Sequence, residues 1–515
     1  MRSAASIPAP ERLAEAAGLS WALGTALFTA VYFVLYLARV PAAATIALAL
    51  IIAVTVMVVG LRRLGTVRAT TARIRSVKSR RCGDERDISG GAGVSPVPGL
   101  TLGRASSAAS ATRSQADKSQ PLGTETGTGA TTSFKAVIVL CCGICVVQIA
   151  VALWVATNSL LRHDDAWTVW AWKARMFALG DLPPDYFTSH NWTAHPDYPL
   201  NLSLVESVFF RLPDPAGLTL ASVVATVYLV ALLLLFYAGL ARLHGRAVAA
   251  LAVGALALVP ALPHFAGYGY ADVPLATYGS AAALYLLLWW RQRCPTDLAL
   301  MGLLAGGAIW TKKEGLPITL ILLCAAAVSC VCWEGIRPLK RRLRPWLASV
   351  LATVALPLPW LVFTRIVRPQ GSDFWPITPA TFVGHADRLP TILGYFLQEA
   401  ASLDDWSLLW IVAPVVVALA LALRRLRLPT LVLLLMFLIQ LGVYLVSYMF
   451  SYWTPYTLHI GSSLNRLVLQ TVPLALLITV DTVCSLAHAE APWAMSQTRG
   501  HGRLANHTDH GRSGT

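Results

Sequence analysis

The sequence predicts an all-α, polytopic membrane protein with about twelve transmembrane helices. Three observations lead to this fold class: 56% of the 515 residues are hydrophobic, only 13% are charged, and the mean hydropathy is +0.60. This composition excludes an ordinary soluble multidomain protein. The 41 Lys and Arg against 26 Asp and Glu would suggest a nucleic-acid partner for a soluble protein. In a membrane protein the same excess indicates positive charge on cytoplasmic loops, so no nucleic-acid partner is expected.

Apolar runs long enough to cross a bilayer are separated by short polar segments. The predicted spans lie near residues 19–39, 41–60, 135–159, 216–240, 247–263, 272–290, 298–310, 315–334, 346–365, 407–423, 429–449 and 467–487. The run 298–310 is short and has glycine within it and proline nearby. We therefore expect it to be a tilted or broken helix, which is tolerated where it packs on protein or lines a cavity.

The distribution of basic residues predicts the orientation. With the N-terminus in the cytoplasm, the predicted spans assign 30 of the 41 Lys and Arg to cytoplasmic segments and 11 to the other side. Five polar segments then open to the non-cytoplasmic face: 160–215, 264–272, 311–315, 366–406 and 450–466. Because the unusual polar residues lie on that face, we expect one site at the outer membrane boundary.

Composition divides the chain into four segments. Residues 1–60 form an extra two-helix membrane segment, and residues 61–134 form a basic, disordered cytoplasmic linker without apolar periodicity. Residues 135–487 form the main transmembrane domain. Residues 488–515 are predicted to be a disordered cytoplasmic tail.

The first large outer loop opens with His163-Asp164-Asp165 and continues into an aromatic segment. Trp167 and Phe177 fall near helical spacing, which predicts an amphipathic helix at the membrane interface, with Lys173 and Arg175 toward polar groups. The paired carboxylates could supply a general base or a metal ligand. The alternative is a helix cap followed by an interfacial aromatic belt.

Two more polar segments belong to the same face. The run His195-Pro196-Asp197-Tyr198 is rigid and polar, and its alternative explanation is a turn fixed by proline. Asp272 enters the sixth predicted span two residues before Pro274. That pattern is also typical of an ordinary helix start.

Cations on the predicted outer side indicate a phosphate. Lys312, Lys313 and Glu314 occupy a tight turn between two apolar runs, where lysine is scarce. A ligand phosphate would explain them, and an ion pair with Glu314 is the alternative. Arg466 follows His459 before the last span, and a guanidinium can bind a phosphate through two parallel hydrogen bonds.

The order of these motifs resembles the GT-C superfamily of integral-membrane glycosyltransferases. The likeness runs through DDAWTVWAWKARMF, HPDYPL, GYGYADVP, TKKEGL and HIGSSLNRL, over roughly residues 135 to 487. It is strongest to bacterial members akin to the dolichyl-phosphate-mannose protein mannosyltransferases and the Rgt-type lipopolysaccharide sugar transferases. The two spans and the linker before residue 135 lie outside the pattern. No DxD-type acidic pair is present, which leaves a divalent metal open as a cofactor.

The resemblance implies a transferase that passes a sugar, with inversion, from a polyprenyl-phosphate carrier to a hydroxyl of a glycan, lipid or protein. The site would face outward from a bacterial plasma membrane. The family's essential acidic residue maps to Asp165, with Asp164 the weaker candidate. The chemistry favours Lys312, Lys313, Arg466, Lys173 and Arg175 as ligands of the donor phosphate. Sugar or acceptor contacts are assigned to His195, Asp197, Tyr198, Asp272, Glu314, His459 and Trp167.

Other functions stay open at this point. A twelve-span secondary transporter would have charges and interrupted helices near the midplane of both halves. A polysaccharide polymerase or ligase acting on a diphosphate carrier would keep the sugar-lipid chemistry and change the step. A membrane scaffold would not account for five polar motifs on one side.

Overall fold

The computed structural model describes residues 9–60, 127–180, 182–183, 185–188, 195–334, 336–369 and 373–487. Over these ranges the regular elements are helices, joined by one isolated bridge between Phe374 and Ser451. The prediction of an all-α fold is therefore confirmed for the described part of the chain. Most of the predicted linker, 61–126, and the predicted tail, 488–515, lie outside the described residues.

The described residues contain seven helices long and apolar enough to cross a membrane, so the protein is membrane-embedded. They are α1 (Ala9–Leu37), the helix Ala42–Gly60, α3 (Gly127–Ser159), α6 (Ala216–His244), α9 (Asp272–Gln292), α18 (Leu428–Met449) and α19 (Tyr456–Ala487). Two bent pairs raise the number to nine if each pair is one span. Helices α11 (Gly315–Glu334) and α17 (Leu409–Ala422) contain shorter apolar stretches.

The interruptions do not lie in the predicted run 298–310. Helix α10 is continuous from Pro295 to Thr311, whereas α7 (Arg246–Ala257) and α8 (Ala261–Tyr268) meet at 62°. The second bend, 53°, separates α12 (Ile336–Ala355) from α13 (Leu358–Val367). Glycine in α10 serves close packing: a Cβ on Gly302 would lie 2.2 Å from the Ser349 carbonyl oxygen of α12. Small residues at such contacts let helix backbones approach.

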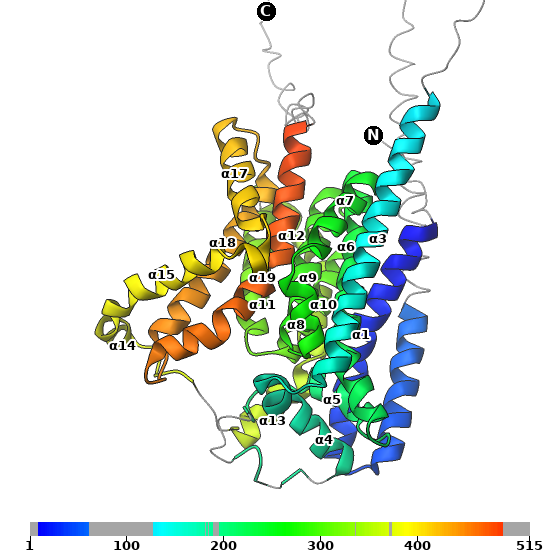
Figure 1. Ribbon diagram of the computed structural model, residues 1–515, viewed down its shortest axis with the longest axis vertical. Helices are drawn as coiled ribbons and strands as arrows, with labels where there is room; N and C mark the ends of the chain where they lie inside the picture. Colours follow the sequence, from blue (N-terminus) through cyan, green and yellow to red (C-terminus); the bar gives the residue numbers. More distant parts are fainter. Residues whose placement is uncertain are drawn as a thin grey trace, which may run out of the picture.

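The bundle is built around α6, α9, α10 and α19. Helix α9 packs against α6, α10 and α19. Within its most apolar stretch of 18 residues, 94% of the residues are buried. Helix α1 packs along α6, and Ala49 and Ala53 of the helix Ala42–Gly60 also belong to the core, so both helices of the predicted extra segment 1–60 contribute to it. The start of α1 and the end of α19 lie at the same end of the bundle (Figure 1).

Short helices gather at the opposite end. The π-helix η1 (Ala166–Ala171) leads directly into α4 (Trp172–Leu179), and α5 (Asn201–Phe209) packs against both. Figure 1 places α4, α5 and α13 together at the lower end of the bundle. Helices α14 (Pro379–Gly384), α15 (Leu389–Ala400) and α16 (Leu403–Trp406), with the 3₁₀ helix η3 (Ala386–Arg388), complete the connection to α17. The helix predicted in the first large loop is therefore present as two joined helical segments.

A buried ionic network at the other end of the bundle corrects the expectation that polar residues concentrate on one face. Arg242 at the end of α6 contacts Glu15 of α1 at 3.0 Å and Asp297 of α10 at 2.7 Å. Arg291 of α9 binds Asp481 of α19 at 3.0 Å. Arg291 and Asp297 lie at the ends of α9 and α10 away from Asp272 and Lys312. They tie five helices together where hydrophobic packing alone gives little specificity.

Candidate functional site

Asp165 and Arg466 form an ion pair at the end of the bundle that carries the short helices. Asp165 precedes η1, directly after α3, and Arg466 lies in α19. An Nη1–H of Arg466 donates to the Asp165 carboxylate, and Nη2 donates to the Ser462 carbonyl at 3.0 Å. The Asp165 side chain is 36% exposed and that of Arg466 only 11%. The guanidinium carbon lies 5.0 Å from the centre of the Tyr270 ring. A carboxylate that solvent can reach is thus held by a largely buried cation.

The pKa of Asp165 lies below its ordinary range. Burial acts to raise it, but the charge and hydrogen bond of Arg466 outweigh burial, with smaller contributions from Lys312 and His195. An opposite charge in direct contact favours the ionised form of a carboxylate. Asp165 is therefore an anion in this arrangement, and its basicity depends on whether Arg466 remains bound to it.

Lys312 forms the buried floor of the same cluster. Its Nζ contacts Asp272 Oδ1 at 2.8 Å and Glu314 Oε1 at 3.0 Å. The amide of Gln470 in α19 donates to the same Asp272 oxygen at 2.6 Å. Burial acts to lower the pKa of Lys312, but the two carboxylates prevail and the pKa is raised. Lys312 is thus a fully charged cation whose charge Asp272 already balances.

Local backbone geometry places the two lysines. Helix α10 ends at Thr311, and Lys312 is extended, with φ −154° and ψ 156°. The Gly315 N–H donates to the Lys312 carbonyl at 2.9 Å. A Cβ on Gly315 would lie 2.0 Å from the Ala308 carbonyl oxygen, so the turn requires glycine. The tight turn therefore fixes both cations at the start of α11.

A hydrogen-bond chain joins α1 to this turn. Thr29 of α1 donates to the Asn201 side-chain oxygen at 2.8 Å, and Asn201 donates to Thr311 Oγ1 at 3.0 Å. The indole of Trp310 donates to Thr29 Oγ1 at 2.8 Å. The N-terminal helix α1 therefore helps to position the residue before Lys312.

Lys313 bridges the turn and the loop before α5. It donates to the Asp197 carboxylate, and its Nζ lies 4.9 Å from the centre of the Tyr198 ring. Tyr198 in turn stacks on His195, with ring centres 4.6 Å apart. Burial raises the pKa of Asp197 even though Lys313 acts to lower it. Lys313 is 37% exposed, so it is the more accessible of the two lysines.

Lys173 is fully buried and is no longer free to meet a phosphate from solvent. Its Nζ donates to the His195 carbonyl at 3.1 Å and lies 5.1 Å from the Trp170 ring centre. Burial lowers the pKa of Lys173 to about 7, against a raising effect of Asp197. Burial also raises the pKa of Glu206 well above its usual range. Neither carboxyl oxygen of Glu206 has a hydrogen-bond partner among the described residues.

The loop before α14 adds an aspartate to the cluster. Asp373 accepts a hydrogen bond from the Trp453 indole at 3.2 Å, and its other oxygen lies 3.7 Å from His195 Nδ1. Burial lowers the pKa of His195 to about 4, so this contact joins a neutral ring to a carboxylate at neutral pH. Trp453 stacks on His459, whose Nδ1 lies 2.9 Å from Ser451 Oγ. Both histidines therefore border the charged cluster.

Two predicted site residues, Arg175 and Trp167, lie away from the cluster, and Asp164 lies exposed beside it. Arg175 is exposed and contacts Asp214 at 3.5 Å, away from the cluster. Asp164 is exposed, and its backbone carbonyl accepts a hydrogen bond from Thr168 at 2.6 Å. Trp167 packs on an apolar group that includes Leu161. Regular helical spacing fails here because the wider π-turn of η1 changes which side chains face inward.

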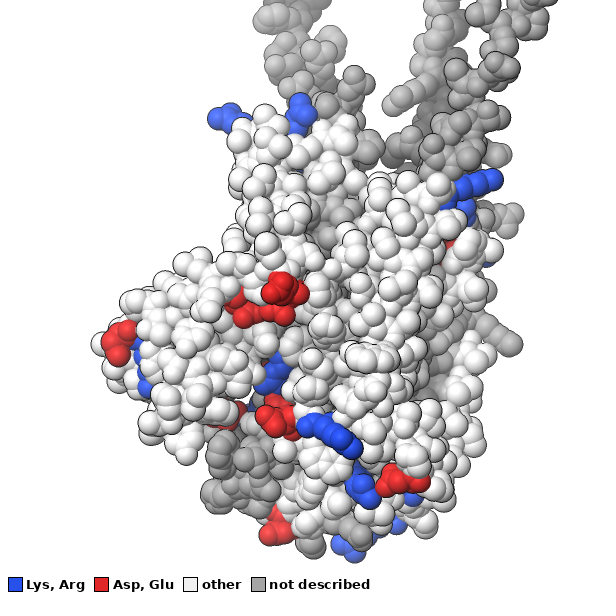
Figure 2. All heavy atoms as spheres, viewed as in Figure 1, with Lys and Arg blue, Asp and Glu red and all other residues white. Residues whose placement is uncertain are grey.

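Several residues in the cluster were not assigned from sequence. They are Trp170, Glu206, Tyr270, Asp373 and Gln470. Gln470 had a usable signal, because an amide inside the last apolar span is costly unless it has a partner. Asp373 and Glu206 had no sequence signal of this kind, since neither belongs to a motif. Figure 2 shows acidic and basic side chains close together on the lower half of the viewed face, below a broad uncharged surface.

Comparison with known proteins found no family model, curated protein or solved structure that matches the chain. Within the described ranges, no group of three or more His, Cys, Asp and Glu is arranged to hold a metal ion. The arrangement offers an accessible carboxylate, a partly accessible lysine and a buried guanidinium. These groups can accept a proton and bind a phosphate.

Proposed function

We propose that the protein is an inverting, GT-C-like membrane glycosyltransferase that moves a sugar from a polyprenyl-phosphate carrier to an acceptor hydroxyl. The observation that carries the proposal is the contact between Asp165 and Arg466, beside Lys312 and Lys313. Three segments far apart in the sequence supply a base and several cations at one place. The reaction requires that combination.

The proposed step is a single displacement. Asp165 accepts the proton of the acceptor hydroxyl. At the same time the oxygen of that hydroxyl attacks the anomeric carbon from the side opposite the phosphate. A new carbon–oxygen bond to the acceptor forms, and the bond from the anomeric carbon to the phosphate oxygen breaks. The electron pair of that bond stays on the carrier phosphate. Arg466 and Lys313 stabilise the developing negative charge.

The ion pair suggests how donor binding prepares the base. With Arg466 bound, the pKa of Asp165 is held low and the carboxylate is a weak base. A carrier phosphate competes for the guanidinium, because phosphate accepts two parallel hydrogen bonds from arginine. Transfer of Arg466 to the phosphate then raises the basicity of Asp165 when the donor is present. Lys312 stays with Asp272 and supplies a fixed positive charge beneath the site.

The finer features of the fold belong to the same proposal. We infer about twelve spans, a bacterial plasma membrane location and a site on the non-cytoplasmic face. The shared end of the first and last described helices supports an even number of crossings (Figure 1). The acceptor is a hydroxyl of a glycan, lipid or protein. The remaining sugar or acceptor contacts are Asp197, Tyr198, His195, Glu314 and His459.

A secondary transporter is the second candidate. The two bent helix pairs favour it, because interrupted helices are typical of such transporters. A polymerase or ligase using a diphosphate carrier is a variant of the first proposal. It predicts the same acidic and basic residues with a different leaving group.

The deciding experiment uses the full-length protein reconstituted in vesicles. Labelled polyprenyl-phosphate sugars and the matching diphosphate sugars are supplied with glycan, lipid and peptide acceptors. Formation of a glycosylated product from the monophosphate donor, lost in Asp165→Asn, supports the proposal. Product from the diphosphate donor alone selects the polymerase or ligase. Uptake of free solute without any product selects the transporter.

A further inference from the structure

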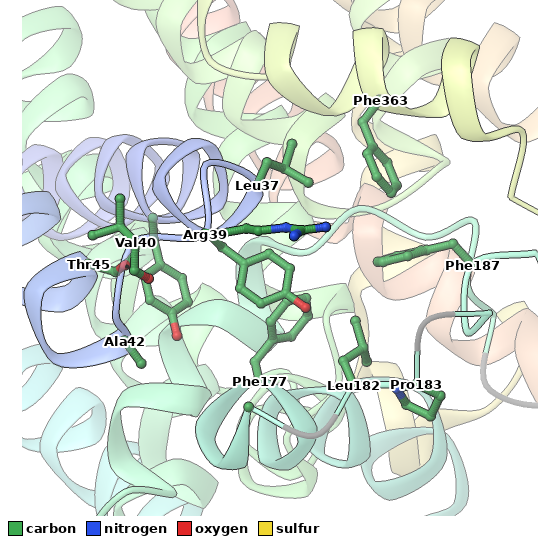
Figure 3. Close-up of a pocket in the computed structure, with 13 residues that line it drawn as sticks. Leu37, Arg39, Val40, Ala42, Thr45, Phe177, Leu182, Pro183, Phe187 and Phe363 are labelled. Atoms are coloured by element: carbon green, nitrogen blue, oxygen red, sulfur yellow. Dashed lines mark hydrogen bonds between the residues drawn. The ribbon is translucent and has the colours of Figure 1, made fainter.

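A second site lies outside the charged cluster, between the N-terminal helix pair and the loop after α4. It is a cavity of about 580 Å³, lined by Tyr36, Arg39, Thr45, Phe177 and Phe187, among others. Figure 3 shows Leu37 of α1, Thr45 of the helix Ala42–Gly60 and Phe177 of α4 among the side chains that converge on it. The size is that of a small-molecule site and the walls are mainly apolar.

Aromatic rings give the cavity rigid walls. The rings of Tyr36 and Phe177 meet edge to face at 4.9 Å, and those of Phe187 and Phe363 do so at 4.8 Å. Edge-to-face pairs hold each other's orientation in addition to burying area. The cavity therefore has a fixed apolar surface suited to a hydrocarbon chain.

Among the described residues that line the cavity, Arg39 is the one with a charged side chain. Figure 3 shows it extended across the cavity toward Phe187. No side-chain partner of the Arg39 guanidinium is found among the described residues, and Arg39 is exposed. A cation without a side-chain partner among the described residues lies next to aromatic walls. This arrangement suits a ligand with an anionic head group and an apolar tail.

The backbone of Arg39 is left-handed, as it is at Arg293, Arg368 and Arg424. Its φ is +58°, the left-handed conformation in which glycine is usual. The Arg39 N–H donates to the Tyr36 carbonyl at 2.9 Å, and the Val40 N–H donates to the Leu35 carbonyl at 3.1 Å. This pair of bonds ends α1 in a Schellman motif. A glycine would adopt this conformation with less backbone strain.

We propose that this cavity binds one anionic membrane phospholipid, with its phosphate on Arg39 and an acyl chain against the aromatic walls. The adjoining helix Ala42–Gly60 has only 17% of its most apolar window buried, so bilayer lipid lies against it. The turn at Arg39 joins the ends of two spans, the depth at which lipid phosphates lie. A phospholipid of the surrounding leaflet reaches the cavity directly from that helix.

The lipid would also brace the candidate site. Phe177 lies in α4 one turn after Lys173, so α4 presents one residue to the cavity and the other to the charged cluster. An occupant would join the N-terminal helix pair to α4. The binding itself does not depend on the proposed transferase activity.

The test is native mass spectrometry of the purified, delipidated, full-length protein titrated with phosphatidylglycerol. We expect one tightly held phosphatidylglycerol and at least tenfold weaker binding of it by Arg39→Gly, because a charge-assisted phosphate contact is lost. Arg39→Gly also relieves the backbone strain, so the delipidated variant should be at least as stable as the parent. Arg365→Gln removes an exposed arginine of α13 that does not line the cavity, and it should bind normally.

A filling variant separates shape from charge. Ala42→Trp keeps Arg39 and should still exclude the lipid, since Ala42 lines the cavity. The proposal is overturned if Arg39→Gly and Ala42→Trp both retain parental affinity for phosphatidylglycerol. It is also overturned if zwitterionic phosphatidylethanolamine binds equally well, or if polyprenyl phosphate displaces phosphatidylglycerol from this cavity. If Arg39→Gly does not accumulate, Arg39→Gln and Ala42→Trp decide the question.

Discussion

The carboxylate of Asp165 and the guanidinium of Arg466 are in contact although 301 positions separate them in the chain. One follows α3, and the other lies in the final described helix, α19. The pair joins the first and last parts of the main bundle across the charged cluster. It also sets the ionisation of the proposed base, and five predictions follow from this and neighbouring contacts.

Replacing Asp165 with Asn should abolish sugar transfer and leave the protein folded. The amide keeps the shape of the carboxylate but cannot accept the proton, so we expect a loss of about a hundredfold or more. Asp164→Asn is the matched control, because that side chain is exposed beside the cluster and should stay active. The measurement is transfer rate on reconstituted protein with abundance checked. An inactive Asp164→Asn with an active Asp165→Asn would move the assignment to Asp164.

Replacing Arg466 with Lys should weaken use of the polyprenyl-phosphate donor more than binding of the acceptor. Lysine keeps the charge but loses the planar fork that can bind a phosphate through two parallel hydrogen bonds. We expect a tenfold or greater rise in the donor KM at fixed salt, since ionic strength alters such contacts. Unchanged donor kinetics would mean that Arg466 serves to position Asp165 alone.

The two adjacent lysines should behave differently. Lys312→Ala leaves the buried Asp272 without its cation, and loss of one partner of a buried ion pair costs about 3 to 5 kcal/mol. Lys313 is 37% exposed and its partner Asp197 is 12% exposed, so Lys313→Ala should cost less stability than Lys312→Ala and should weaken donor binding. Thermal unfolding in detergent measures the first effect, and donor titration measures the second. Equal stability of the two variants would contradict the buried pairing of Lys312.

Lys173 should make stability depend on pH. Its pKa falls to about 7 in the folded protein from 10.5, because burial disfavours the charged form. Between about pH 7 and 10.5 the unfolded chain holds a proton that the folded chain has released, so stability rises with pH across that window. Lys173→Met should remove this contribution. The measurement is the thermal unfolding midpoint of the parent and of Lys173→Met at each pH. The difference, parent minus variant, should increase from pH 7 to pH 9, and a constant difference would argue against a lowered pKa.

The orientation can be tested by labelling with a membrane-impermeant thiol reagent. After replacement of the native cysteines, Thr188→Cys in the loop after α4 should label from outside the cell. Arg424→Cys, at the opposite end of the bundle, should label after permeabilisation only. Both parent residues are exposed, so accessibility does not distinguish them. The reverse pattern would invert the topology.

The sequence by itself determined the fold class and the end of the bundle on which the motifs meet. Long apolar runs require helices in lipid, and successive connections alternate between the two sides. That alternation is enough to group Asp165, Asp272, Lys312 and Arg466. The same reasoning could not find the cavity around Arg39, because its walls come from segments without a shared motif.

Only the tertiary structure decided which groups touch. Hydropathy fixes how each helix crosses, but the lateral order and rotation of helices depend on side-chain packing. Packing pairs Lys312 with Asp272, adds Gln470 and buries Lys173. The π-turn of η1 accompanies the outward position of Arg175, which helical spacing had grouped with Lys173. Partner choice and burial set the charge of each group, so the chemistry of the site follows from packing that the linear pattern does not encode.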